Sequence, residues 1–265
     1  MSAKNSNAST IMTALVLCLV CSVMVAAVAV GLKPKQNENA LLDLNKNVLV
    51  AAGQFDPATD TNAVVVDRIK DFEIKLIDMQ TGEFISDDVI QAQGINVETY
   101  DMGKASKTPS MSSTLTNDIV RIGRVPKYGK VYIQRAADGS PKLIVMPFYG
   151  YGLWGTIYGL VTLEGDMNTI KGVSFYQHKE TPGLGALIEE DWWRDTWVGK
   201  RVYNDQGQII TGITKAGNSR ENYIDGISGA TLTGRGVNNM IQFWLGEDGY
   251  KPFLDNLRQK YGKGA

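Results

Sequence analysis

One long uncharged stretch near the amino terminus constrains the whole chain. No charged residue lies between Lys4 and Lys33, and residues 11–32 are almost wholly apolar. A helix needs about 20 apolar residues to cross a hydrocarbon core of ~30 Å, so we expect one membrane-spanning helix here. The alternative is a cleaved signal peptide, with a small-x-small cleavage site at Ala27-Val28-Ala29. The apolar stretch is longer than the usual signal-peptide core of about 7–15 residues, which favours a retained helix.

The charges around this stretch do not settle its orientation. Lys33 and Lys35 follow it, whereas only Lys4 and the amino terminus precede it. Counted alone, the positive-inside rule would leave the large domain inside the cell. Long domains cross membranes largely regardless of such small biases, so charge alone does not settle the topology. With either a retained helix or a signal peptide, we expect the bulk of the chain to be exported.

The composition excludes several classes of function. The chain has 265 residues, enough for one or two domains, and its net charge of -1 comes without any Lys/Arg-rich patch, so we expect no nucleic-acid partner. It contains one histidine, His178, which excludes a histidine-based metal cluster. Both cysteines, Cys18 and Cys21, lie three apart in the apolar stretch and would share one helix face. We interpret them as packing residues and expect no metal, the alternative being metal ligation together with cysteines of another subunit.

The remainder predicts an α+β domain with a mainly antiparallel sheet. Pro34 should end the membrane helix, and residues 37–52 have the spacing of a separate short helix. Residues 71–85 are typical of a hairpin around residues 80–82, and residues 105–117 are typical of a loop. Strand-like segments occupy residues 131–135, 142–148, 156–164, 170–177 and 208–215, and helical segments occupy residues 184–195 and 234–245.

A glycine-rich segment, Gly150 to Gly155, matches the dinucleotide-binding pattern G-x-G-x-x-G. That pattern indicates a nucleotide site only where a helix follows it, because the amides at the helix N-terminus bind the phosphates. Here residues 156–163 are strand-like, so we reject a Rossmann site. We expect a tight turn between strands, with Trp154 packed nearby.

A second segment, Asp225 to Thr233, runs directly into the predicted helix of residues 234–245. Its small residues let the backbone approach a bound group, and the amides and dipole of a helix N-terminus favour an anion such as phosphate. Ser228, Thr231 and Thr233 supply hydroxyl groups there. The alternative is an ordinary Ser/Thr cap of the helix.

A third segment, His178 to Gly185, forms a turn between a predicted strand and a predicted helix. A lone histidine in such a turn is more typical of a capping or surface group than of a catalyst. Glu180 and Thr181 would place an acceptor and a hydroxyl group where a planar ligand could approach.

These segments together resemble a known family. Asp225 to Thr231 is similar to the motif D-G-x-S-G-A-T of the FMN-binding domain family, and Glu180 to Gly185 resembles the second motif of that family. The apolar N-terminal stretch, residues 36–53 and the Gly150 to Gly155 segment resemble the C subunits of the sodium-translocating NADH:quinone oxidoreductases (Na⁺-NQR). The resemblance covers nearly the whole chain and is least distinctive in residues 56–116.

The resemblance implies a covalent cofactor and a set of residues around it. The phosphate of FMN would be esterified to Thr231, a modified residue and not a catalyst, by a separate flavin transferase that uses FAD and Mg²⁺. The implied cofactor-binding residues are Trp154, Glu180, Thr181, Gly183, Leu184, Lys215, Ser228, Gly229, Ala230, Leu232 and Thr233. The implied transferase-recognition residues are Asp225, Gly226, Ser228, Gly229, Ala230 and Thr231. A cation such as Lys215 near the reduced ring would raise the flavin potential.

The resemblance also implies a place in the cell and a function. Residues 1–10 would be cytoplasmic, residues 11–32 would span the bacterial inner membrane, residues 33–125 would form a membrane-proximal region, and residues 126–265 would form the FMN-binding domain in the periplasm. With the other membrane subunits, the chain would relay electrons from NADH towards ubiquinone, coupled to Na⁺ export, without an NADH site of its own. The alternatives are the flavin subunit of an RNF-type ferredoxin:NAD oxidoreductase and a non-enzymatic exported binding domain.

Overall fold

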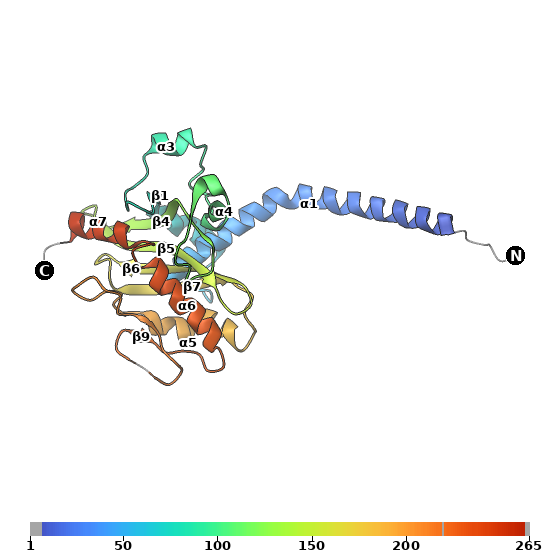
Figure 1. The fold of residues 1–265 in the computed structure, drawn as a ribbon. Coiled ribbons are helices and arrows are strands. Elements are labelled where there is room, and N and C mark those ends of the chain that lie inside the picture. Colours follow the sequence, from blue (N-terminus) through green and yellow to red (C-terminus); the bar gives the residue numbers. More distant parts are fainter. Residues whose placement is uncertain (1–6, 219, 263–265) are drawn as a thin grey trace. The chain divides into compact units, whose positions relative to one another are not determined.

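The computed structural model describes residues 7–218 and 220–262, and it divides at residue 43 into two units (Figure 1). The first unit is the amino-terminal part of a long helix. The second unit, from Leu44 onward, holds the sheet, the remaining helices and the core.

The amino-terminal helix, α1 (Asn7–Ala51), is one continuous helix of 45 residues. Among the described residues it is the one helix long and apolar enough to cross a membrane. The predictions that Pro34 ends the helix and that residues 37–52 form a separate helix are therefore wrong. A proline inside a helix removes one backbone hydrogen bond, and the helix can continue when both flanks are stable. On the carboxyl side, burial of Val48 and Leu49 within the second unit provides that stability.

The second unit is built on one sheet of five strands, and its antiparallel pairing confirms the predicted kind of sheet. The strands are β1 (Phe72–Asp78), β4 (Tyr128–Arg135), β5 (Pro141–Tyr151), β6 (Thr156–Glu164) and β7 (Ile170–Gln177). They lie in the order β1-β4-β5-β6-β7. The predicted limits of β6 and β7 agree with the structure, because Gly155 precedes the first run of β-branched and aromatic residues and a turn beginning at Gly165 separates it from the second.

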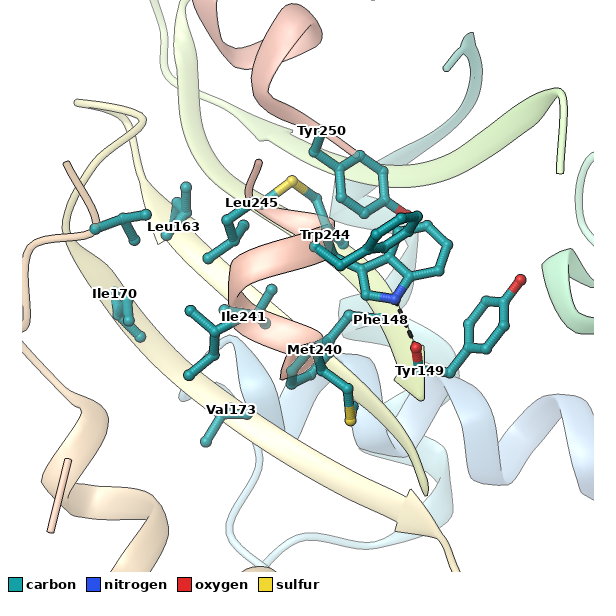
Figure 2. Close-up of a cluster of buried hydrophobic side chains, with 14 of the residues drawn as sticks. Phe148, Tyr149, Leu163, Ile170, Val173, Met240, Ile241, Trp244, Leu245 and Tyr250 are labelled. Carbon is teal, nitrogen blue, oxygen red and sulfur yellow. Dashed lines mark hydrogen bonds between the residues drawn. The ribbon is translucent and has the colours of Figure 1, made fainter. Parts of the chain in front are cut away.

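Helices cover both faces of this sheet. On one face, α6 (Thr231–Trp244) lays Met240, Ile241 and Trp244 over the strands, and the Trp244 indole Nε1 donates to the Tyr149 carbonyl at 2.6 Å (Figure 2). Successive side chains of β7 point to opposite faces of the sheet, so Val173 faces α6 and Gly172 lies on the other face. On that other face, the last turn of α1 lies against β7, where a Cβ on Gly172 would collide with the Ala51 carbonyl. Because α6 packs along the sheet in this way, its first turns lie near the end of β5 and the beginning of β6.

Several shorter elements differ from the predictions. The helix predicted at residues 184–195 is broken into three pieces, because Glu190 adopts an extended conformation and the chain turns to bury Trp193 and Trp197 against Phe175. The pieces are η3 (Gly185–Glu189), α5 (Asp191–Arg194) and η4 (Asp195–Trp197). The predicted strand at 208–215 reduces to β8 (Gly212–Ile213), which pairs in parallel with β9 (Tyr223–Ile224).

The segment predicted as a loop at residues 105–117 contains regular structure. It holds the end of α4 (Met102–Ser106), the turn η2 (Pro109–Met111) and β2 (Ser112–Thr114), which pairs with β3 (Arg124–Pro126). The hairpin predicted at residues 71–85 is confirmed only as a bridge between Ile77 and Phe84. The other helices are α2 (Asn62–Arg68), η1 (Ile69–Asp71), α3 (Asp87–Ala92) and α7 (Lys251–Tyr261).

A buried lysine on β4 gives the folded domain a pH-dependent stability. Lys130 is 2% exposed, and its ammonium donates to the Glu98 carbonyl at 2.5 Å. Burial lowers the pKa of Lys130 from 10.5 to about 8, against the opposing effects of Asp101 and Glu98. The unfolded chain binds this proton more tightly, so the cost of the buried charge is present below the folded pKa and is relieved as pH rises.

We predict that the free energy of unfolding rises by about 2 kcal/mol between about pH 8 and about pH 9.5. The measurement is urea unfolding of the full-length chain in detergent at a series of pH values. Lys130→Met, which carries no titrating group, should lack the rise. Equal pH dependence in the two proteins would contradict the assignment to Lys130.

Candidate functional site

Three segments that are distant in the sequence meet at one pocket on the second unit. They are the β5–β6 turn, the segment that follows β7, and the start of α6. The cavity has a volume of about 150 Å³. Its lining residues are Leu153, Glu180, Thr181, Leu184, Gly185, Gly229, Ala230, Thr231, Leu232 and Thr233.

The start of α6 presents unused hydrogen-bond donors to this pocket. The helix begins at Thr231, three residues before the predicted start, so that Thr231 lies in its first turn with an exposed side chain. Ala230 occupies the cap position, and no side chain caps the helix, which argues against the ordinary Ser/Thr cap. Gly229 precedes it with φ of 78°, a conformation that favours glycine. The free amides and the helix dipole therefore favour an anion at this point.

The buried carboxylate of Glu180 joins the three segments. One of its oxygens, Oε1, accepts from the backbone amides of Leu153 at 3.0 Å and of Trp154 at 3.1 Å. The other, Oε2, accepts from the Thr233 hydroxyl at 2.5 Å. Glu180 is 5% exposed and Thr233 is 1% exposed, so the Thr233 hydroxyl is used inside the protein and faces Glu180. The hydroxyl groups predicted together at the phosphate site are thus separated, with that of Thr231 exposed and that of Thr233 buried.

Two glycines permit this carboxylate to approach the backbone. A Cβ on Gly152 would lie 2.6 Å from Glu180 Oε1, and a Cβ on Gly185 would lie 2.5 Å from Thr233 Oγ1. Any larger residue at either position would push the carboxylate away from its donors. Gly152 and Gly185 therefore keep the Glu180 carboxylate in the position in which it joins the walls of the pocket.

Gly150 and Tyr151 end β5, and residues 152–155 form the predicted turn, which leads directly into β6 and not into a helix. The Gly152 amide donates to the Gly155 carbonyl at 2.8 Å. Trp154, which was expected to pack near this turn, is 62% exposed, and its indole Nε1 donates to Thr181 Oγ1 at 3.1 Å. The indole and the Thr181 side chain thereby join the turn to the segment after β7 beside the pocket.

The structure separates the remaining predicted residues. Trp154, Gly183, Lys215 and Ser228 are exposed and are absent from the pocket lining, whereas Leu153 and Gly185 line it and were missed. Leu153 lies in the Gly150 to Gly155 segment, which was interpreted as a structural turn. Its place in that glycine-rich segment is the one feature of the sequence that pointed to a role in the site. Lys215 lies beyond β8, which runs beside β9 and not along the pocket.

Asp225 and Gly226, the first residues of the predicted transferase motif, pack against the backbone of residues 214–217. The Asp225 carboxylate accepts from the Gly217 amide at 3.1 Å and from the Thr214 hydroxyl at 3.3 Å. A Cβ on Gly226 would collide with the Thr214 carbonyl. His178 has the expected local role, since its Nδ1 accepts from the Glu180 amide at 3.2 Å. Within residues 7–218 and 220–262, no cluster of side chains could hold a metal ion.

Residues 152–246 match the family model described as FMN-binding domain, and every pocket residue falls inside this range. The fold and the pocket therefore define an FMN-binding domain on a chain with an apolar N-terminal helix.

Full-length relatives identify the family. The chain is 42% identical to the C subunit of the Na⁺-translocating NADH-quinone reductase of Pseudomonas aeruginosa, over 98% of this chain and 99% of that protein. It is 41% identical to the C subunit of the Yersinia pestis enzyme, over 96% of this chain and 94% of that protein. The crystal structure of NqrC from Shewanella oneidensis superposes with a TM-score of 0.74 at 34% identity, covering 85% of this chain and 99% of that one. The chain belongs to the family of the C subunits of the Na⁺-translocating NADH-quinone reductases.

Two glycines of α6 give a matched test of how the helix fits the site. A Cβ on Gly236 would lie 2.7 Å from the Tyr151 carbonyl, whereas a Cβ on Gly234 would lie 3.6 Å from its nearest neighbour. Alanine favours a helix over glycine by about 1 kcal/mol, so Gly234→Ala should stabilise the protein by up to that amount. Gly236→Ala should instead destabilise it by about 1–3 kcal/mol, because α6 must move off the β5–β6 turn. Urea unfolding measures both, and equal effects would contradict the close packing.

Proposed function

We propose that Thr231 carries FMN through an ester between its Oγ1 and the phosphate of the cofactor. The observation that supports this most strongly is the uncapped start of α6, with an exposed threonine hydroxyl in its first turn at the pocket. A phosphate on Thr231 would lie where the helix dipole and free amides stabilise negative charge. Gly229, which also lines the pocket, leaves the approach to this hydroxyl free of a side chain.

The pocket fits part of the isoalloxazine ring. Its volume of about 150 Å³ is below the range of about 300–1,000 Å³ of sites that enclose a whole small molecule. The apolar side chains of Leu184 and Leu232, which are 45% and 49% exposed, extend the site outward. The exposed indole of Trp154 donates to Thr181, which lines the same pocket. These residues would orient the ring, and FMN supplies the capacity to accept and donate electrons.

Attachment requires a second enzyme, because an isolated threonine hydroxyl is a weak nucleophile. A flavin transferase using FAD and Mg²⁺ would form the bond between Thr231 Oγ1 and the phosphorus next to the riboflavin. The pyrophosphate bond of FAD breaks, AMP leaves with the electron pair, and the hydroxyl proton is released. Exposure of Thr231 and Ser228 makes the segment accessible to such an enzyme. Asp225 and Gly226 would hold that segment in the conformation that the enzyme recognises.

The chain would act as an electron-carrying subunit in a complex with other membrane subunits. The relatives are named for electron transfer from NADH to quinone and for Na⁺ translocation. The apolar part of α1 would anchor the chain in the bacterial inner membrane, with the second unit in the periplasm. The Gly150 to Gly155 turn lacks the helix that a dinucleotide site needs, so NADH would bind elsewhere in the complex.

The relatives favour this function over an RNF-type flavin subunit, since those from Pseudomonas aeruginosa and Yersinia pestis carry the name of the quinone reductase and match over nearly their whole length. They equally favour it over an exported binding domain without a cofactor.

The proposal predicts a mass increase equal to an FMN ester when the chain is produced with a flavin transferase. The increase should vanish in Thr231→Ala, and fragmentation of the modified peptide should place the adduct on Thr231 and not on Thr233, whose hydroxyl is buried. Intact mass and flavin fluorescence after denaturing electrophoresis measure this. An adduct that persists in Thr231→Ala, or a colourless wild-type chain, would contradict it.

Protease digestion of spheroplasts from outside tests the periplasmic location.

A further inference from the structure

A strained arginine lies beside the site, outside the range that matches the FMN-binding domain. Arg121 has φ of 55°, which is uncommon for any residue with a side chain. It belongs to the loop of residues 118–123, more than twenty residues before the matched range begins at residue 152. A residue held in this conformation indicates that surrounding contacts compensate for the strain.

The side chain of Arg121 binds the β5–β6 turn. Its guanidinium donates to the Gly152 carbonyl at 2.8 Å and, more weakly, to the Tyr151 carbonyl at 3.4 Å. The guanidinium also lies over the Tyr151 ring, 4.5 Å from its centroid. Stacking restricts the guanidinium, so less freedom is lost when it binds the carbonyls.

The Gly152 carbonyl and the Leu153 amide belong to the same peptide group. Arg121 therefore binds the oxygen end of this planar group, while the Glu180 carboxylate binds its N–H end. Both are charge-assisted hydrogen bonds, with the cation at the negative end of the peptide dipole and the anion at the positive end. Rotation of this peptide would break both bonds at once. A peptide group next to glycine rotates easily, so hydrogen bonds at both of its ends are needed to keep this peptide in one orientation.

The loop that carries Arg121 is itself tied to the site. The Val120 carbonyl accepts from the Tyr151 amide at 2.8 Å, and the Asn239 side chain on α6 donates to the Ile119 carbonyl at 2.9 Å. The Asp118 carboxylate accepts from the Gly123 amide at 2.6 Å and closes the loop. The guanidinium is thus fixed relative to both the turn and the helix that bears Thr231.

We propose that Arg121 is a positioning residue for the flavin site: with Glu180 it locks the peptide between Gly152 and Leu153, and so holds Leu153 and Trp154 against the cofactor. The proposal rests on the proposed FMN site. It extends that site to a residue outside the range that matches the FMN-binding domain family. The lock keeps the Glu180 carboxylate directed at backbone amides and away from the ring, where a free negative charge would oppose reduction.

Arg121→Asn tests the lock directly, because asparagine tolerates the positive φ but cannot reach the turn. Loss of a charge-assisted hydrogen bond should speed hydrogen exchange of the amides in residues 151–155 by roughly tenfold. The visible circular dichroism of the attached flavin should fall, since its surroundings become less fixed, while the mass increase on Thr231 persists. Arg121→Lys keeps the charge but not the planar fork, and it should give intermediate values. Both readouts use the full-length chain in detergent, produced with a flavin transferase.

Arg124→Ala is the matched control, since this nearby arginine donates to the Ser112 carbonyl at 2.8 Å and does not bind the turn. It should leave the exchange of residues 151–155 and the flavin spectrum unchanged. Wild-type exchange and dichroism in Arg121→Asn would overturn the proposal, as would equal changes in Arg124→Ala. If Arg121→Asn does not fold, wild-type values in Arg121→Lys would overturn it. A wild-type chain without flavin would contradict the proposed function instead, while the exchange measurement still tests the lock.

Discussion

The buried carboxylate of Glu180 is the interaction on which the architecture of the site depends. It binds two backbone amides of the β5–β6 turn and the hydroxyl of Thr233 on α6. A buried charge is tolerated only when hydrogen bonds replace the lost water, and three donors do so here. Removing any donor would leave part of the charge unpaired, so the three segments are energetically coupled. The pocket is therefore a consequence of satisfying this carboxylate.

The helix α6 connects the pocket to the core. Its carboxyl-terminal half lies over the sheet with Met240, Ile241 and Trp244 in the core, and its first turn forms one wall of the site. Gly236 lets the helix touch the β5–β6 turn directly. Because the packed half cannot shift without opening cavities, the position of Thr231 relative to the turn is set by the core. A site built on a rigid helix suits an electron carrier, since the cofactor must stay in a fixed place.

Much of the fold follows from local sequence patterns, and the exceptions have physical reasons. The limits of β6 and β7 and the apolar stripe of α6 could be predicted because turn residues and periodicity agree there. The interruption of α1 at Pro34 was predicted wrongly, because tertiary burial of Val48 and Leu49 outweighs a local preference. The motif at residues 225–231 indicated the position of Thr231, but not that Thr233 points inward to Glu180. Leu153 and Arg121 were missed from the sequence, since their roles arise from contacts between distant segments.

In the proposed holoprotein, a flavin is linked through its phosphate to the start of α6 while Glu180 holds the walls of the pocket together. A crystal structure of the chain produced with a flavin transferase tests this most directly. We expect electron density continuous from Thr231 Oγ1 to a phosphate at the first amides of α6, with Glu180 still bound to the amides of Leu153 and Trp154. A flavin seated away from this pocket, or a Glu180 carboxylate turned out of its three hydrogen bonds to bind the ring, would contradict it.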